Sequence, residues 1–223
     1  MDLYRDKVTE ILTNAEKYHL AYYEADTFRG PSLYFHQRAI QTHQSGDFLV
    51  HVELVYATLA SWGMHRMGRG GSKMVGFNVF RDSIERIKNN ILKAQHYTVQ
   101  HMSPSQWRVL EEMFRGIKVM ATNTSLVGNS KVMHHMMPDI VPPIDREYTL
   151  RYLRGNTNIA NDLNGEWSTM KEIISHFFIP IACDPELENR AKCWMRNQAQ
   201  FPWDTSVMKI IDNLLIGRRK CSA

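Results

Sequence analysis

The feature that most constrains the fold is a proline-rich break, Val141–Pro142–Pro143–Ile144, in the middle of a long apolar stretch. Each proline fixes its own φ and pushes the residue before it towards an extended conformation, so these four residues cannot all be helical. Asp145 follows immediately, and aspartate is a preferred helix N-cap. The sequence therefore predicts two helices separated by the prolines, with Asp145 at the start of the second.

A small-residue turn is predicted before this break, at Gly128–Asn129–Ser130. Glycine adopts unusual backbone angles, and asparagine and serine tolerate or cap them, so a turn followed by a helix is expected here. The simplest interpretation of Ser125–Leu153 is an ordinary helical hairpin with an N-capping aspartate, because such turns and caps are common in all-α proteins.

The same stretch resembles the helix-hairpin-helix DNA glycosylase superfamily. The hairpin of that family reads Leu-Pro-Gly-Val-Gly and is followed by a catalytic Asp after a turn rich in Val, Ile and Pro. Leu126, Gly128 and Ser130 fall on the Leu and the two Gly positions of the hairpin. Pro143–Ile144–Asp145 is similar to the segment that ends in the catalytic Asp. The resemblance is confined to Ser125–Leu153.

This resemblance implies a base-excision enzyme that acts on a damaged or modified base flipped out of double-stranded DNA. Asp145 would stabilise the positive charge that develops on the sugar as the base leaves. The backbone amides of Gly128, Asn129 and Ser130 would hold the DNA backbone without reading its sequence, and Arg146 would add a phosphate contact.

The position of the lysine departs from the family pattern. The nucleophilic lysine of that family comes two positions after the second hairpin glycine, which is Val132 here, whereas Lys131 is one position early. One position is about 100° around a helix. We therefore expect water to attack the sugar and Lys131 to be a surface lysine that contacts a phosphate, with attack by the Lys131 amine as the alternative.

A basic, glycine-rich segment, Ser61–Met74, is a second candidate contact for a polyanion. Its glycines allow backbone N–H groups to approach an anion closely, and Arg66, Arg69 and Lys73 supply positive charge. The segment has neither a Walker motif nor Gly-x-Gly-x-x-Gly after a clear strand, which argues against a nucleotide fold. A solvated loop without a ligand is an equal alternative, because a net charge of +4 permits a polyanion partner without requiring one.

Four side chains are candidates for a base pocket, because a flipped base needs aromatic or apolar surroundings. They are Trp62, Trp107, Tyr148 and His134. The alternative for each aromatic residue is an ordinary core position. His134 and His135 are adjacent and point in different directions on a helix, so they do not predict a shared metal site, and no metal is expected.

Composition restricts the class of protein. A chain of 223 residues, of which 43% are hydrophobic, is long enough for one large domain or two small lobes. Its charged N-terminus and the lack of an apolar run of about 18 residues predict neither a signal peptide nor a membrane span, and favour a cytoplasmic protein. The three cysteines include no Cys-x-x-Cys pair, so neither an iron–sulfur cluster nor another cofactor is expected.

Apolar residues at helical spacing predict an all-α chain with two lobes around a cleft. One lobe is expected to comprise residues 1–75 and 155–223, and the other residues 76–154 with the helix-hairpin-helix element. The expected helices cover Asp2–Glu24, Ser32–His43, Phe48–Met67, Asn78–Gln100, Pro104–Gly116, Glu166–Phe178 with a stop at Pro180, Glu186–Ala199, and a last helix from the turn at Pro202–Trp203–Asp204 through Ile216.

The function that the sequence favours is therefore a DNA N-glycosylase, with Asp145 and Lys131 as its candidate catalytic residues. Two other classes stay open: a helical protein that binds nucleic acid without catalysis, and a helical protein-interaction module. Salt-dependent DNA binding would separate the last class from the first two, because phosphate contacts release counterions. Base release would separate the first from the second.

Overall fold

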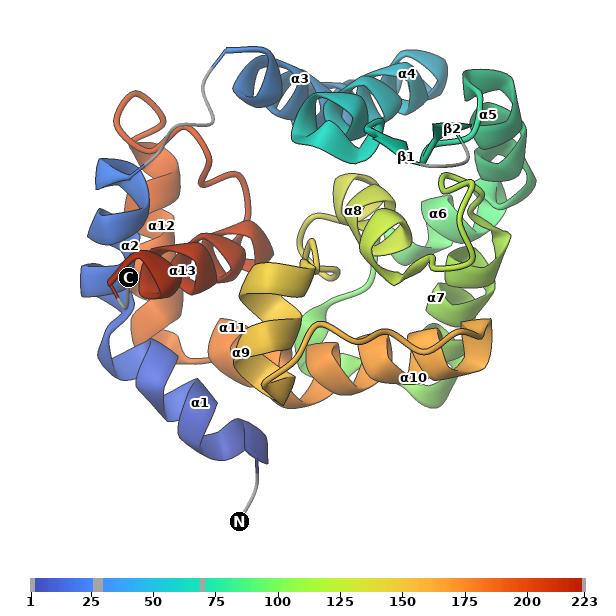
Figure 1. The fold of residues 1–223 in the computed structure, drawn as a ribbon. Helices are drawn as coiled ribbons and strands as arrows, with labels where there is room; N and C mark the ends of the chain where they lie inside the picture. Colours follow the sequence, from blue (N-terminus) through green and yellow to red (C-terminus); the bar gives the residue numbers. More distant parts are fainter. Residues whose placement is uncertain (1–2, 26–29, 69–70, 222–223) are drawn as a thin grey trace.

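The computed structural model describes residues 3–25, 30–68 and 71–221, and these residues are helical apart from one small β-hairpin and the connecting loops (Figure 1). The expected all-α fold is confirmed. The α-helices are α1 (Leu3–Thr13), α2 (Ala15–Glu24), α3 (Pro31–Ser45), α4 (Phe48–Leu59), α5 (Phe77–Arg86), α6 (Lys88–Ala94), α7 (Pro104–Gly116), α8 (Leu126–Met136), α9 (Arg151–Arg154), α10 (Leu163–Ile173), α11 (Ile179–Ala182), α12 (Pro185–Arg196) and α13 (Val207–Cys221).

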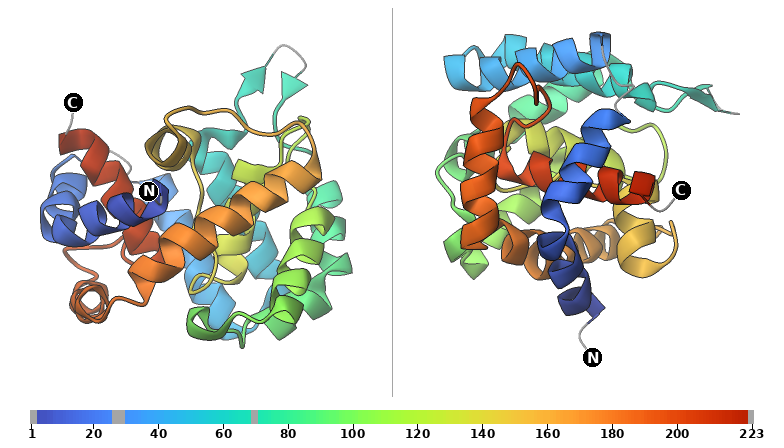
Figure 2. Two further views of the ribbon diagram at one scale, coloured as in Figure 1. Left: turned by 90° about the horizontal axis from the view of Figure 1, so that it is seen from below. Right: turned by 90° about the vertical axis from the view of Figure 1, so that its left-hand side faces the viewer.

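Short non-α segments interrupt or extend these helices. Three are π-helical, η1 (Ala60–Met64), η3 (Arg146–Leu150) and η4 (Ile174–Phe178), and η2 (Val99–His101) is a 3-10 turn. Strands β1 (Met67–Gly68) and β2 (Gly71–Ser72) pair antiparallel and project from the helical body (Figure 2). Within the ranges that the structure describes, no helix is long and apolar enough to cross a membrane.

Helices from the two ends of the chain lie side by side. The C-terminal helix α13 crosses α2 in close contact, and α1 packs against η4 and α11 (Figures 1 and 2). In contrast, α3 and α4 pack against each other and against α8. The lobe boundaries stay a prediction, although these contacts associate α3 and α4 with α8 rather than with α2.

Two predicted long helices are each divided in the structure. Asp2–Glu24 is broken at Asn14, whose side-chain amide donates to the Glu10 carbonyl oxygen at 2.9 Å. Such a side chain competes with the backbone for helical hydrogen bonds. Asn78–Gln100 is broken at Ile87, where φ is −104° and ψ is 8°.

The predicted stop at Pro180 is wrong, because helical structure continues through α11 to Ala182. The π-helical segment η4 lies immediately before α11. A proline normally clashes with the carbonyl four residues earlier, and a widened turn relieves that contact.

Other boundary predictions are confirmed. Ser103 forms a complete capping box with Gln106, and Pro104 occupies the first position of α7. Asp145 is the N-cap of η3, and Val141–Ile144 is not helical.

The predicted turn at Gly128–Asn129–Ser130 is wrong, because these residues lie inside α8 and are buried. The connection from α7 to α8 is instead the loop of residues 117–125. A β-carbon on Gly128 would lie 2.6 Å from Met120 Cγ, and the Asn129 amide donates to the Phe114 carbonyl oxygen at 2.8 Å. These small residues serve helix packing, so we do not propose that they contact a phosphate.

A glycine also allows α13 to approach α2. A β-carbon on Gly217 would overlap the carbonyl oxygen of Tyr18 and lie 3.0 Å from the backbone nitrogen of Tyr22. We expect Gly217→Ala to lower the free energy of unfolding by about 1–3 kcal/mol or more, measured by urea denaturation. In an exposed helix the same change would stabilise the protein, so the sign of the effect is decisive.

Gly76→Ala is the matched control for this prediction. Its φ is −62°, and a β-carbon there would meet no atom within 4 Å. If the free energy of unfolding of Gly217→Ala were as high as that of Gly76→Ala, the close approach of α13 to α2 would be contradicted.

Candidate functional site

The candidate site is a pocket where α2, η1, α8, η3 and α13 converge. Its volume is about 140 Å³, which is below the range of about 300–1,000 Å³ that is usual for sites of drug-sized ligands. Aromatic rings and two lysine–aspartate pairs line it. The lining residues are Tyr22, Trp62, Lys131, Pro143, Asp145, Tyr148, Trp203, Lys209, Asp212 and Ile216.

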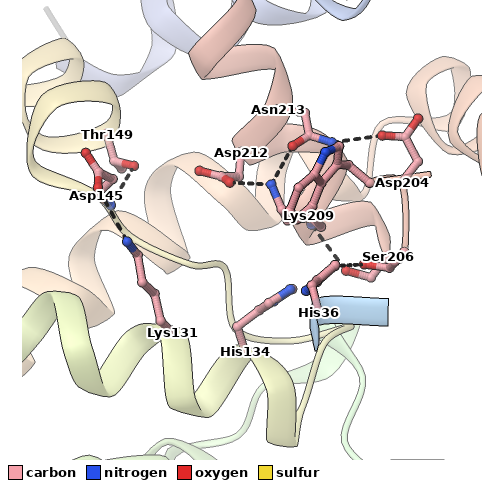
Figure 3. Close-up of polar contacts among 12 residues, drawn as sticks. His36, Lys131, His134, Asp145, Thr149, Asp204, Ser206, Lys209, Asp212 and Asn213 are labelled. Atoms are coloured by element: carbon pink, nitrogen blue, oxygen red, sulfur yellow. Dashed lines mark hydrogen bonds and ion pairs between the residues drawn. The ribbon is translucent and has the colours of Figure 1, made fainter. Parts of the chain in front are cut away.

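The first pair is Lys131 with Asp145. Lys131 Nζ lies 3.5 Å from Asp145 Oδ2, and the two side chains are 13% and 30% exposed (Figure 3). Lys131 projects from α8 towards the start of η3. The expectation of a surface lysine is therefore wrong, because Lys131 lies largely buried against the predicted catalytic aspartate.

A hydrogen bond between neighbouring residues explains why Lys131 and Asp145 meet. The hydroxyl oxygen of Ser130 accepts from the backbone N–H of Ile144 at 3.1 Å, which fixes the proline-rich segment against α8. Lys131 follows Ser130, and Asp145 follows Ile144. The lysine and the aspartate are therefore brought together.

Asp145 is held in a defined orientation by the first turn of η3. Its Oδ1 accepts from the backbone N–H groups of Glu147 at 2.8 Å and Tyr148 at 3.4 Å. Its own backbone N–H donates to Thr149 Oγ1 at 3.2 Å, and its carbonyl oxygen accepts from Leu150 N–H at 3.0 Å, as in a π-turn. These contacts leave Oδ2 facing Lys131, and π-turns often occur at functional sites.

A buried carboxylate fixes the start of α8. Glu166 is fully buried, and its Oε2 accepts from the backbone N–H groups of Ser125, at 2.7 Å, and Leu126. Burial raises the pKa of Glu166, and the hydrogen bonds from these two amides oppose that rise. A negative charge at a helix N-terminus is stabilising, so Glu166 anchors the helix that carries Lys131.

The second pair is Lys209 with Asp212, one turn apart on α13. Lys209 Nζ donates to Asp212 Oδ2 at 2.8 Å and to Asn213 Oδ1 at 2.5 Å (Figure 3). Lys209 is 4% exposed and Asp212 is 6% exposed. Burial raises the pKa of Asp212, whereas the nearby charge of Lys209 lowers it, and the charge of Asp145 adds to the rise.

A buried chain of hydrogen bonds orients Lys209. The Asn213 amide donates to Asp204 Oδ1 at 2.8 Å, so its carbonyl oxygen must face Lys209. Asp204 Oδ2 accepts from His19 Nε2 at 2.6 Å, and the His19 ring stacks on Trp194 with 3.9 Å between centroids. Buried charges need such partners, because desolvating an unpaired ion is costly.

Aromatic rings form the walls between these pairs. The ring centroids of Trp62 and Trp203 are 6.4 Å apart and inclined at 50°. Lys131 Nζ lies 5.5 Å from the Trp62 centroid, and Lys209 Nζ lies 5.6 Å from that of Trp203 and 5.7 Å from that of Tyr22. The two ammonium groups therefore lie close to ring faces that would otherwise attract a cation.

Buried histidines pack behind this pocket. One of them, His135, lies on α8 one turn after Lys131. His135 Nδ1 donates to the Lys131 carbonyl oxygen at 2.7 Å. Its Nε2 is 3.0 Å from His36 Nδ1, whose other ring nitrogen is 2.9 Å from Thr205 Oγ1. With both rings neutral, His36 donates to His135 and accepts from the threonine hydroxyl. Each ring nitrogen named here thus has a partner.

Burial lowers the pKa of four buried histidines, His36, His51, His134 and His135. The pKa is about 3 for His135 and about 4 for His51, and it lies well below its usual value for His36 and His134. Burial is the largest cause in each case, and neighbouring histidines lower all four pKa values further. The cluster is therefore neutral at pH 7.

The structure brings some predicted site residues together and separates others. Trp62 and Tyr148 line the pocket with Lys131 and Asp145, as predicted. Trp107 does not, because its ring is buried against Trp167 with 6.3 Å between centroids. That candidate was wrong because core and pocket aromatics have the same helical spacing in the sequence.

His134 was also a wrong candidate for the pocket. It is fully buried, and its Nδ1 donates to the Val141 carbonyl oxygen at 2.8 Å. Its Nε2 has no partner within the described part of the chain. His134 therefore supports the proline-rich segment rather than lining the pocket.

Three of the predicted phosphate contacts, Arg146, Arg66 and Lys73, are exposed. Arg146, in the first turn of η3, donates to Thr124 Oγ1 at 3.3 Å. Arg66 and Lys73 lie exposed on either side of the β1–β2 hairpin. Arg69 lies outside the described residues. Phosphate binding by these residues stays a prediction.

Sequence reasoning missed one whole wall of the pocket. Trp203 was interpreted only as part of a turn, and Lys209 and Asp212 were assigned no role. A signal was present, because Lys209, Asp212 and Asn213 interrupt an apolar run at spacings of three and four. Those spacings place three polar side chains on one face of a buried helix, where each needs a partner.

No family model, no curated protein and no solved structure matches this chain. Within residues 3–25, 30–68 and 71–221, no group of three or more His, Cys, Asp or Glu side chains is placed to hold a metal ion.

Proposed function

We propose that this protein is a DNA N-glycosylase in which Asp145 stabilises the sugar cation and Lys131 attacks the sugar. One observation carries the proposal: Lys131 Nζ lies 3.5 Å from Asp145 Oδ2 at an aromatic pocket. A carboxylate beside an amine is what excision with a covalent intermediate requires. The resemblance of Ser125–Leu153 to helix-hairpin-helix glycosylases points to the same two residues.

The aromatic walls suit a planar ligand. A base flipped out of a duplex is held by stacking between aromatic or apolar side chains. Trp62, Trp203 and Pro143, which line the pocket, would offer such surfaces. Arg146, Arg66 and Lys73 are the candidate contacts for the phosphates on either side of the flipped nucleotide.

In the proposed reaction the bond between C1′ and the base breaks, and its electron pair leaves with the base. The carboxylate of Asp145 stabilises the positive charge that develops on the sugar. Lysine attacks only as a free amine, so Lys131 gives up a proton, the departing base takes up a proton, and the base leaves neutral. The amine nitrogen then forms a new bond to C1′.

Opening of the sugar ring converts this adduct to an imine between Lys131 and C1′. Hydrolysis of the imine releases the amine and leaves an abasic site in the DNA. Borohydride would reduce the imine to a stable amine, so the intermediate can be trapped as a covalent protein–DNA complex.

Asp145→Asn is the direct test of the carboxylate. We expect base release from a lesion-containing duplex to fall by roughly 10²-fold or more, while affinity for the duplex is retained, because a preorganised charge is lost. Asparagine caps a helix as well as aspartate does, so fraying of η3 cannot account for the loss. Single-turnover base release and equilibrium binding give the two measurements.

Asp162→Asn is the matched control. Asp162 is the N-cap of α10, where its side chain accepts from Gly165 N–H at 2.8 Å, and it does not line the pocket. Full activity in folded Asp145→Asn would reduce Asp145 to a helix cap. Salt-dependent DNA binding without base release in the unmodified protein would indicate a non-catalytic nucleic-acid-binding protein instead.

A further inference from the structure

The charges at the closed side of the pocket restrict which bases it could accept. Lys209 and Asp212 line the pocket but are almost fully buried, and neither is needed for the attack by Lys131. Burying a lysine–aspartate pair costs free energy unless its hydrogen bonds are well satisfied. A pair kept in a ligand pocket at that cost is a candidate for ligand recognition.

The geometry of Lys209 leaves one hydrogen-bond donor for a ligand. An ammonium group has three donors. Asp212 Oδ2, at 2.8 Å, and Asn213 Oδ1, at 2.5 Å, accept two of them. Asp204 and His19 fix Asn213 from behind, so the ammonium group is held by a rigid, buried frame.

The positions of both lysines argue against a positively charged ligand. Lys131 lies near the face of Trp62, and Lys209 lies near those of Trp203 and Tyr22. Asp145 offsets the charge of Lys131 and Asp212 offsets that of Lys209, so the two pairs leave no net negative charge that would attract a positively charged base. The carbonyl oxygen of a neutral base could instead accept a hydrogen bond from the third N–H of the Lys209 ammonium group.

We propose that Lys209 and Asp212 form a base-recognition subsite that selects a neutral, carbonyl-bearing base over a cationic, alkylated base. This inference rests on the proposed glycosylase function and names its substrate class. A neutral base takes negative charge as its bond to the sugar breaks, and the Lys209 ammonium group stabilises that charge. A cationic base becomes neutral as it leaves and gains nothing from the same group.

The first test uses the unmodified protein and a set of otherwise identical duplexes. Three carry a neutral carbonyl-bearing base (uracil, hypoxanthine or 8-oxoguanine), and one carries the cationic base 7-methylguanine. We expect release of at least one neutral base at a rate at least 10²-fold above that of the cationic base. Release of 7-methylguanine at an equal or higher rate overturns the inference.

The second test is Lys209→Met, which keeps the length of the side chain and removes its charge. We expect release of the preferred neutral base to fall by about 10²-fold, while release of 7-methylguanine stays constant or rises. Lys192→Met is the matched control, since Lys192 is 53% exposed and pairs with Glu188 on α12. A folded Lys209→Met protein with a full rate on the neutral base overturns the inference.

A fifth duplex separates this inference from the proposed function. It contains an abasic site, so it can form the Lys131 imine without any base. If borohydride traps an adduct with this duplex but no neutral base is released, the proposed attack by Lys131 is supported. The same result overturns the proposed base-recognition subsite. Neither an adduct nor release of any base overturns both. If Lys209→Met does not fold, the rates of base release by the unmodified protein on the set of duplexes still test the inference.

Discussion

Lys131→Ala is expected to abolish the covalent complex that borohydride traps between this protein and a duplex with an abasic site. The expectation follows from the position of Lys131 Nζ, 3.5 Å from Asp145 Oδ2 and 5.5 Å from the Trp62 ring centroid. Only a primary amine forms the imine that borohydride reduces, so its removal leaves nothing to trap. Denaturing electrophoresis of a labelled duplex measures the adduct.

Lys131→Arg is the sharper variant for the same experiment. Arginine keeps a positive charge beside Asp145, so folding and DNA affinity should be close to those of the unmodified protein. Its guanidinium group stays protonated and does not form the imine. We therefore expect no adduct from Lys131→Arg, and a normal adduct from the exposed control Lys192→Ala.

Two results would contradict this role of Lys131. An adduct that persists in Lys131→Ala would identify another amine as the nucleophile, and Lys209 would be the first to test because it lines the same pocket. Base release without any adduct in the unmodified protein would restore the initial expectation that water attacks the sugar.

Mild acid is expected to unfold the protein through its buried histidines. The pKa values of His36, His134, His135 and His51 are lowered in the fold, whereas in the unfolded chain they lie near 6.5. The stability that these neutral rings contribute is fully present above that unfolded value. It is lost as the pH falls below about 6.5, because the unfolded chain then binds protons that the folded protein excludes.

The expected effect is large because four groups change together. Each contributes about 1.4 kcal/mol per pH unit below its unfolded pKa, down to its folded pKa. Between pH 7 and pH 5 the free energy of unfolding should fall by an amount on the order of 8 kcal/mol, comparable to the whole stability of many domains. Urea denaturation at a series of pH values measures the slope.

Buried carboxyl groups oppose this loss. Burial raises the pKa values of Glu166 and Asp212 in the fold, so the folded protein binds their protons more readily than the unfolded chain does. Their effect on stability begins as the pH falls through those raised values and has the opposite sign. It therefore reduces the slope.

A histidine substitution provides the control for the acid experiment. His51→Asn removes one of the four groups, so the slope of the free energy of unfolding against pH should fall by the contribution of about one proton. His96 is exposed, so His96→Asn should leave this slope unchanged. A free energy of unfolding that stays constant from pH 7 to pH 5 would contradict the neutral, buried cluster.

Much of the helical architecture followed from local chemistry in the sequence. Ser103 and Pro104 started α7 as their types predict, and the prolines before Asp145 set that residue at an N-cap. Boundaries failed where a side chain or a widened turn intervened. Asn14 broke the first predicted helix through its bond to Glu10, and η4 carried helical structure past Pro180.

The candidate site was only half accessible to sequence reasoning. Asp145, Trp62 and Tyr148 were named from the resemblance and from residue type, and they do line the pocket. Trp107 was named for the same reasons and lies in the core. Residue type shows that an aromatic side chain will be buried but does not show whether its neighbours are core residues or a cavity.

The sequence by itself determined the fold class, the N-cap at Asp145 and the break before it, because these depend on residues close together in the chain. Only the tertiary structure decided that Lys131 faces Asp145 and that Lys209 closes the other side of the pocket. The first contact depends on the hydrogen bond between Ser130 and Ile144, and the second on the approach of α13 to α2 at Gly217. Contacts between distant segments depend on packing, which helical periodicity and capping rules do not specify.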